Sequence, residues 1–366
     1  MSEQQSETPD NGMSLAEMQE SMQAFVEQAV SRGQKSIELA NAPPQPVGLT
    51  PKELLYSRGT MRLYHYEAQT DEVYRVPVLL VMATTNKAFI FDLAPGRSMI
   101  EYMVQQGFDM YVLDWQAPTW AERGLTLKDY TQDFIPTCVE KIQQESGVED
   151  VSIIGYCMGG VLSLIYAATH TDGPLKNLVC LATPVNNHTT SISRVWNDPK
   201  FFDVDYLVDT VGILSAESVT QMFEMQRPAQ RLAGQLRLWD QMLDDDFVDN
   251  YRAFNRWGEE TLPLAGEFVR ETTKELNWGN KLFTGELMVD GKNANLANLQ
   301  VPLLSCVAQH DHLAPRDATE CLLGLVGSED KEEVLLKGGH VSLIAGPNAA
   351  KRMYPRLNEW LALRSV

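Results

Sequence analysis

A cysteine placed between glycines is the residue of this chain with the clearest capacity for covalent chemistry. Cys157 lies in the string Gly-Tyr-Cys-Met-Gly-Gly, residues 155–160, directly after the β-rich run 151–154 and directly before the apolar run 161–168. Strand, tight turn and helix form the local context of a nucleophile elbow, in which the nucleophile occupies a strained turn. Glycines beside it allow the strand and the helix to approach closely. The alternative is that Cys157 is a small buried apolar residue in an ordinary strand–helix turn.

Two further residues follow later strands in the order that such an elbow requires. Asp311 comes after the apolar run 301–308, and His340 comes after the strand signal at 333–336. In this architecture the nucleophile, the acid and the base follow in that chain order, each on a loop at the C-terminal edge of a strand. We therefore predict that His340 activates the Cys157 thiol and that Asp311 orients the imidazole. Taken singly, Asp311 is explained as well by a helix cap, and His340 by a hydrogen-bonded loop histidine.

The same interpretation predicts the groups that stabilise an oxyanion and the kind of reaction. One donor is the backbone N–H of Met158, just after the nucleophile, and a second comes from the loop 84–86 after the strand 76–82. Acyl transfer from a thioester to a thiol gives another thioester, which stays activated for attack by an oxygen nucleophile. This chemistry favours an acyltransferase that uses acyl-CoA over a simple ester hydrolase.

Composition bounds the class of protein. With 366 residues, the chain is long enough for one large α/β domain with an insertion, or for two modest domains. A net charge of −19 argues against a nucleic-acid-binding surface. Five scattered cysteines without a C-x-x-C pair argue against a disulfide framework or a zinc site, and suit a reducing compartment. We see no signal peptide and no apolar run of membrane-spanning length, so we expect a cytoplasmic protein without a membrane span.

Strand signals alternate with helical segments along most of the chain, which predicts a mostly parallel, doubly wound sheet. The pattern changes between residues 186 and 285, where aromatic and acidic residues occur in irregular helical pieces. We expect 186–285 to be an inserted cap over a core made of 49–185 and 286–366; a small helical domain with no gating role is the alternative. The strand signals are at 56–66, 76–83, 110–114, 151–154, 175–182, 301–308 and 333–336.

The first 48 residues read as a separate arm. We expect residues 1–12 to be a disordered tail, 13–30 to be an amphipathic helix with a methionine-rich face, and 42–48 to be a stiff proline-rich linker. The apolar face of the helix either packs on its own domain or offers a surface to a partner protein.

Several sequence blocks, taken together, resemble the polyhydroxyalkanoate synthases. The chain is most similar to the short catalytic subunits of the two-component (class III or IV) type, from about Leu49 to Leu361. The blocks are Asn86-Lys87, Phe91-Asp92-Leu93, Asp114-Trp115, Leu125 to Tyr130, Gly155 to Gly160, Thr183-Pro184-Val185, Asn280-Lys281-Leu282, Gly285-Glu286-Leu287, Asp311-His312 and Gly338-Gly339-His340.

The resemblance implies an α/β-hydrolase core with a cap and a site formed by Cys157, His340 and Asp311. It also implies a homodimer, a second, non-catalytic subunit and a location on the surface of cytoplasmic polyester granules. Coenzyme A enters as part of the thioester substrate, and no separate cofactor and no metal are implied.

Three further positions take roles from the resemblance alone. It implies an oxyanion donor from the Asn86 backbone beside that of Met158, and it places His312 where a family histidine is thought to approach CoA. The chain departs from the family at Met158, where many members carry Gln or Val, and at Thr84-Thr85, which replace more apolar residues. These departures change the expected shape of the pocket and remove no catalytic side chain.

The sequence thus predicts a granule-associated acyltransferase that polymerises (R)-3-hydroxyacyl-CoA, releases CoA and carries the growing polyester on Cys157. We expect a short-chain substrate such as 3-hydroxybutyryl-CoA. One alternative is a cysteine esterase like dienelactone hydrolase, whose elbow shares the G-Y-C-x-G-G string but whose chain is shorter and lacks so long an insertion. A catalytically silent granule-binding protein is the other alternative.

Overall fold

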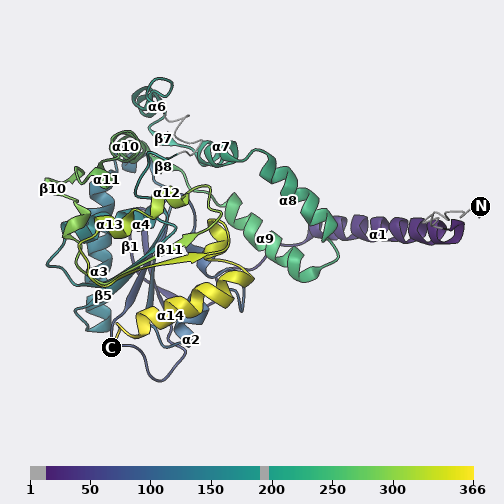
Figure 1. Ribbon diagram of the computed structural model, residues 1–366, viewed down its shortest axis with the longest axis horizontal. Helices are drawn as coiled ribbons and strands as arrows, with labels where there is room; N and C mark the ends of the chain where they lie inside the picture. Colours follow the sequence, from purple (N-terminus) through teal and green to yellow (C-terminus); the bar gives the residue numbers. More distant parts are fainter. Residues whose placement is uncertain (1–13, 190–197) are drawn as a thin grey trace, which may run out of the picture. The chain divides into compact units, whose positions relative to one another are not determined.

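An eight-stranded, mostly parallel sheet forms the centre of the structure, a computed structural model that describes residues 14–189 and 198–366 (Figure 1). The strand order across the sheet is β1-β2-β4-β3-β5-β6-β11-β12. The β1–β2 and β2–β4 pairs are antiparallel, and all later pairs are parallel. The bounds are β1 (Lys52–Arg58), β2 (Met61–Tyr66), β3 (Val78–Val81), β4 (Met110–Trp115), β5 (Val151–Tyr156), β6 (Leu175–Leu181), β11 (Leu303–Ala308) and β12 (Lys331–Leu336).

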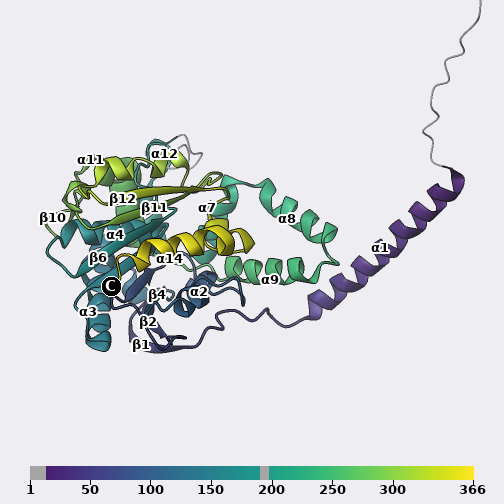
Figure 2. The ribbon, with the colours of Figure 1, turned by 60° about the horizontal axis from the view of Figure 1, so that its bottom comes forward.

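Helices cover both faces of this sheet, so β3, β4, β5 and β11 are buried along their whole length. The connection from β3 to β4 runs toward one edge of the sheet and the connection from β4 to β5 runs back. Right-handed crossovers therefore place α2 on one face and α3 and α4 on the other. α14 packs beside α2, and α3 packs beside α4 (Figure 2). The predicted doubly wound sheet is confirmed. These helices are α2 (Met99–Gln105), α3 (Ile135–Ser146), α4 (Met158–Thr169) and α14 (Tyr354–Ala362).

The chain between β6 and β11 is mainly helical in its described part. Two two-residue strands, β7 and β8, pair within it, and α6 packs against α10. The backbone N–H of Leu127 donates to Glu271 Oε2 over 2.7 Å, which ties this insertion to the core. Its elements are α6 (Val204–Val211), β7 (Ile213–Leu214), α7 (Ala216–Gln226), α8 (Ala229–Asp240), α9 (Asp245–Glu259), β8 (Leu264–Ala265), α10 (Gly266–Glu271), the π-helix η4 (Thr272–Trp278) and α11 (Lys281–Thr284).

The chain divides into two compact units, of which the first combines residues 1–45 with 229–252 and the second combines 46–228 with 253–366. The first unit joins α1 (Leu15–Asn41) to part of the chain that the sequence assigns to the cap. Polar contacts hold it together: Lys35 Nζ lies 2.7 Å from Asp245 Oδ1, and Arg32 Nη2 donates to the Asp240 carbonyl over 3.1 Å. The gating role of the insertion remains a prediction.

Two predicted elements differ in extent from the structure. α1 continues to Asn41, eleven residues beyond the predicted helix (41 − 30 = 11), and ends just before the Ala42-Pro43 step, where proline disfavours helix in the preceding residue. The strand signal at 56–66 covers two strands, because the chain turns at Gly59, whose φ is +53°. The predicted tail, residues 1–12, lies outside the described residues. Within the described ranges no helix, α1 included, is both long and apolar enough to cross a membrane.

The junction between β5 and α4 depends on glycine. A Cβ added at Gly159, in the first turn of α4, would overlap the Val81 carbonyl oxygen and lie 2.7 Å from that of Met82. A Cβ at Gly155 would lie 2.5 Å from the Gly160 Cα. Real Cβ atoms do not approach backbone this closely, so only glycine lets α4 start directly above the end of β3.

We predict that Gly159→Ala lowers the free energy of unfolding by about 1–3 kcal/mol, the usual cost of forcing an extra carbon into packed structure. Urea unfolding followed by circular dichroism measures this change. Gly324→Ala is the matched control, because a Cβ at Gly324 would meet no atom within 4 Å. Equal stability of both variants would contradict the packing argument.

Candidate active site

Cys157 occupies the turn between β5 and α4 in a conformation that L-residues rarely adopt. Its φ is +52° and its ψ is −120°, and its backbone N–H donates to the Leu181 carbonyl over 2.9 Å. Such a backbone costs of order 1–3 kcal/mol and persists only where the surrounding structure enforces it. The side chain is partly exposed, whereas Cys138, Cys180 and Cys306 are buried. Cys157 therefore has the geometry and the access that a nucleophile needs.

The structure brings the two other predicted residues to this turn. His340 Nδ1 lies 2.7 Å from Asp311 Oδ2, and both side chains are buried. The Cys157 side chain lies close enough to His340 to raise the pKa of the imidazole. Because Nδ1 is engaged by Asp311, Nε2 is the nitrogen that remains for the thiol. Cys157, His340 and Asp311 are thus brought together in the arrangement by which an imidazole activates a nucleophile.

Asp311 is itself held by the loop on which it lies. Its Oδ1 accepts the backbone N–H groups of Leu313 and Ala314, each over 2.9 Å, which leaves Oδ2 for the imidazole. The carboxylate thus both orders its loop and orients His340. The structure does not show Asp311 as a helix cap: the next helix, α12 (Arg316–Thr319), has Pro315 at its N-cap and no side-chain cap hydrogen bond.

The charge state of His340 follows from its neighbours. Burial by itself lowers the pKa of the imidazole, but the negative charge of Cys157 and the hydrogen bonds and charge of Asp311 outweigh it and raise the pKa of His340 to about 10. The imidazolium form of His340 is therefore favoured at neutral pH, as expected of an imidazole that activates a cysteine nucleophile.

Both predicted oxyanion donors have a backbone N–H that no hydrogen bond among the described residues uses, and one of them, Met158, adjoins Cys157 in the chain. Met158 is the first residue of α4, so its N–H has no intrahelical acceptor, and the helix dipole favours negative charge there. The Asn86 N–H lies on the loop after β3. The predicted role of both groups as oxyanion donors is compatible with this geometry.

His312 follows Asp311 directly and is half-buried. Burial, helped by the positive charges of Arg227 and His340, lowers the pKa of the His312 imidazole despite the opposing charge of Asp311. His312 is therefore neutral at pH 7 and offers a hydrogen bond rather than a charge. Its predicted contact with CoA remains a prediction.

Tyr156 belongs to the site although no sequence pattern assigns it there. Its ring lies 5.1 Å from the His340 ring, centroid to centroid, and its hydroxyl is 3.5 Å from the His340 carbonyl oxygen. Tyr156 is the last residue of β5 and is buried, so it fixes one face of the imidazole. Only its position next to the nucleophile marks it in the sequence.

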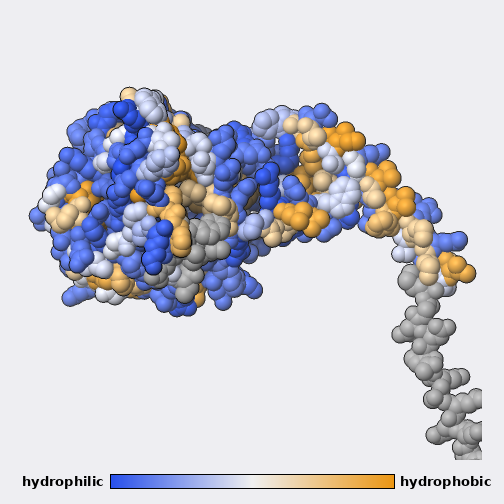
Figure 3. All heavy atoms as spheres, turned by 90° about the horizontal axis from the view of Figure 1, so that it is seen from above, coloured by the Kyte–Doolittle hydropathy of each residue, from blue (hydrophilic) through white to orange (hydrophobic). Residues whose placement is uncertain are grey.

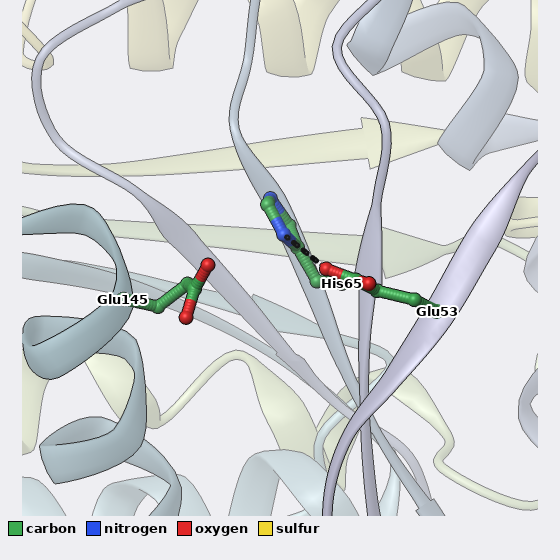
Figure 4. A group of neighbouring side chains, drawn as sticks. All are labelled: Glu53, His65 and Glu145. Atoms are coloured by element: carbon green, nitrogen blue, oxygen red, sulfur yellow. Dashed lines mark ion pairs between the residues drawn. The ribbon is translucent and has the colours of Figure 1, made fainter.

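A second group of acidic and imidazole side chains lies on β1, β2 and α3 (Figure 4). Glu53, His65 and Glu145 form it, and both glutamates are exposed. His65 Nε2 lies 2.7 Å from Asp109 Oδ1, and Nδ1 lies 3.8 Å from Glu53 Oε1. Burial opposes the charge on His65, but the Asp109 hydrogen bond and charge raise its pKa. We interpret the group as an ion-pair network that supports the hairpin.

Comparison with known families agrees with the geometry of the site. The profile of the alpha/beta hydrolase fold matches residues 90–347, which confirms the predicted fold class. The profile described as the N-terminus of poly-beta-hydroxybutyrate polymerase (PhaC) matches residues 11–103.

Three relatives of this chain share the name poly(3-hydroxyalkanoate) polymerase subunit PhaC. The poly(3-hydroxyalkanoate) polymerase subunit PhaC of Allochromatium vinosum is 33% identical over 90% of this chain and 93% of that protein. The subunit of the same name from Synechocystis sp. is 31% identical over 93% of this chain and 91% of its own length. The one from Haloferax mediterranei is 33% identical over 87% of this chain, which spans only 65% of that longer protein.

Solved structures show the same fold at low sequence identity. A soluble variant of the monoglyceride lipase of Saccharomyces cerevisiae superposes with a TM-score of 0.58 at 16% identity, covering 89% of this chain and all of the lipase. The monoacylglycerol lipase of Paleococcus ferrophilus gives a TM-score of 0.51 at 15% identity, covering 82% and 99%. These likenesses concern the fold alone.

We predict that the Cys157→Ala variant lowers the pKa of His340, because it removes a side chain that raises this pKa while the burial that lowers it remains. In the parent protein the ring should stay protonated until the pH rises toward about 10; in the variant it should lose its proton at lower pH. NMR of the histidine ring nitrogens across a pH titration measures both. Cys321→Ala, which removes a thiol on another loop, is the control, and an unchanged His340 pKa in Cys157→Ala would contradict the ion pair.

Proposed function

Because the chain belongs to the poly(3-hydroxyalkanoate) polymerase (PhaC) family, we propose that it polymerises (R)-3-hydroxyacyl-CoA into polyester and releases CoA. One observation carries this proposal: the nucleophile at the elbow is a thiol beside a buried imidazole that Asp311 orients. A thiol conserves the activation of an incoming thioester, which polymerisation requires and hydrolysis does not.

The proposed acylation step follows from the geometry. The Cys157 thiolate attacks the carbonyl carbon of the acyl-CoA thioester, and the carbonyl oxygen takes up the electron pair as an oxyanion. In this proposal the N–H groups of Met158 and Asn86 stabilise that charge. Collapse of the intermediate breaks the bond to the sulfur of CoA, and the His340 imidazolium gives its proton to the departing thiolate. The acyl group is then a thioester of Cys157.

Elongation uses the same residues in reverse order. Neutral His340 takes the proton of the 3-hydroxyl group of another 3-hydroxyacyl unit. The oxygen of that hydroxyl attacks the acyl-Cys157 carbonyl. An ester bond forms, the bond to sulfur breaks, and the thiolate–imidazolium pair is restored. Water in place of the hydroxyl would end the chain, so the proposal requires the insertion to limit the access of water.

The finer features of the proposal come from the resemblance stated above. We extend it to a short-chain substrate such as 3-hydroxybutyryl-CoA, to contact of His312 with CoA, and to catalysis without a further cofactor. It also includes the two-component subtype, a homodimer and cytoplasmic action on the granule surface. A location at the granule surface would let a soluble CoA ester and an insoluble polyester reach the same thiol.

The exposed apolar residues of α1 support the proposal that this chain binds a partner protein. None of the 27 residues of α1 is buried, although a helix without an apolar contact is only marginally stable in water. Apolar side chains gather along it (Figure 3). In the same unit, α8 and the turn after it add further exposed apolar side chains. The exposed apolar residues of this unit include Leu15, Met18, Met22, Phe25, Val26, Val30, Ile37, Leu232, Leu236, Trp239 and Leu243.

We predict that Cys157→Ala abolishes turnover of 3-hydroxybutyryl-CoA, with a loss of at least about a thousandfold, because no other group can form the acyl intermediate. Free CoA and insoluble polymer, measured together, test this. Cys321→Ala should retain both products. CoA release without polymer in the parent protein would indicate hydrolysis, and turnover by Cys157→Ala would refute the choice of nucleophile.

We also predict that the lone chain is slow and that the non-catalytic subunit of the same organism's synthase raises its rate by about tenfold or more, roughly 1.4 kcal/mol of barrier. Phe25→Glu, which places a charge on the apolar face of α1, should abolish the stimulation and leave the lone-chain rate unchanged. Gln28→Glu adds the same charge on the polar face and should keep the stimulation. Full activity of the lone chain would count against the two-component assignment.

A further inference from the structure

The loop that follows β3 carries Asn86, and it is held from two sides. An oxyanion donor is effective only if its N–H already points to the place where the charge develops, because reorienting it during the reaction would cost the stabilisation it offers. The rate of acylation should therefore depend on the contacts that hold this loop in place. Those contacts come from side chains that have no part in the mechanism above.

On the side of the core, a buried ion pair anchors the end of the loop. Lys87 Nζ lies 2.6 Å from Asp114 Oδ2 and 2.6 Å from the Trp115 carbonyl oxygen. Asp114 Oδ1 accepts the backbone N–H of Ala88 over 2.7 Å. Asp114 lies in β4, so these contacts fasten the loop to the neighbouring strand of the sheet.

On the other side, the insertion holds the loop through three hydrogen bonds. The Leu262 N–H donates to the Thr85 carbonyl over 2.7 Å, and the indole N–H of Trp257 donates to the Lys87 carbonyl over 2.8 Å. The Asn86 side-chain amide donates to Thr261 Oγ1 over 3.2 Å. Trp257 is buried although it lies at the C-terminal end of α9.

The pattern of these hydrogen bonds determines the direction in which the backbone N–H of Asn86 points. Asn86 and Thr261 form an isolated antiparallel bridge, and the bond from Leu262 goes to Thr85, the residue before Asn86. In extended chain, successive residues direct their backbone N–H and C=O groups to opposite sides. Thr85 and Lys87 turn toward the insertion, so Asn86 turns its N–H away from it. That N–H has no acceptor among the described residues.

We infer that Trp257 and Thr261 are positioning residues for acylation: they hold the loop 85–87 so that the Asn86 N–H stays aimed at the oxyanion. The inference rests on the proposed function and adds a task to the insertion. Besides covering the site, the insertion completes the oxyanion hole through the segment 257–262. Displacing this segment would weaken the stabilisation of the intermediate while the Cys157–His340 pair stayed intact.

The test compares two reactions of Cys157 that differ in one respect. Acylation by 3-hydroxybutyryl-CoA or by p-nitrophenyl acetate passes through an oxyanion, whereas alkylation by iodoacetamide does not. Trp257→Phe keeps the aromatic packing and removes the N–H donor. We expect it to slow both acylations by about tenfold to a hundredfold, as small displacements of a catalytic donor do, and to leave the alkylation rate and its pH profile unchanged.

Thr261 provides the second variant and its own rescue. Thr261→Val removes the acceptor of the Asn86 amide and should slow acylation in the same selective way, whereas Thr261→Ser keeps the hydroxyl and should restore the rate. Trp120→Phe is the control for loss of an indole, because Trp120 is exposed and its N–H meets no acceptor among the described residues. Circular dichroism shows whether each variant is folded.

Each outcome decides the inference. Unchanged acylation in Trp257→Phe and Thr261→Val would overturn it, and so would an equal loss of acylation and alkylation, which would indicate a general structural role. The proposed function fails separately. If the parent protein is acylated by p-nitrophenyl acetate but forms no polymer from 3-hydroxybutyryl-CoA, the polymerase assignment is wrong, and the ester reaction still decides the role of the two residues.

Discussion

The structure depends on keeping one charged imidazole inside the protein. A buried imidazolium is unfavourable unless anions on both sides compensate for its lost hydration. Asp311 forms a hydrogen bond with the ring, and Asp311 and Cys157 together raise the pKa of His340. The three residues follow three different strands, β5, β11 and β12. Only the folded sheet brings the ends of these strands together, so the thiol can be activated only in the folded protein.

Around this pair, each layer of the fold performs a separate task. The sheet supplies strand ends that converge at one edge, and glycines at residues 155 and 159 let α4 begin close to the end of β3. The loop after β3 is fastened to the sheet through Asp114 and to the insertion through Trp257. We assign the insertion a part in positioning this loop.

The unit that contains α1 has a different character. Ion pairs such as Lys35–Asp245 join its helices, and many of its apolar side chains are exposed, although Met242 and Val248 are buried. Large exposed apolar surfaces commonly mark interaction sites. The proposed function thus assigns catalysis and association to different parts of the chain. Such a division suits a protein whose soluble substrate and insoluble product have to meet at one site.

The sequence by itself determined the features that depend on local pattern and on chain order. Apolar runs located the strands, glycines beside Cys157 located the elbow, and the order nucleophile, acid, base located Asp311 and His340, because parallel strands joined by crossovers end at the same edge of the sheet. Only the tertiary structure decided the contacts between distant segments. Trp257 meets the Lys87 carbonyl across 170 residues, and residues 229–252 cluster with α1. No local pattern encodes such contacts, because they arise from where the folded insertion places a few hydrogen-bonding groups.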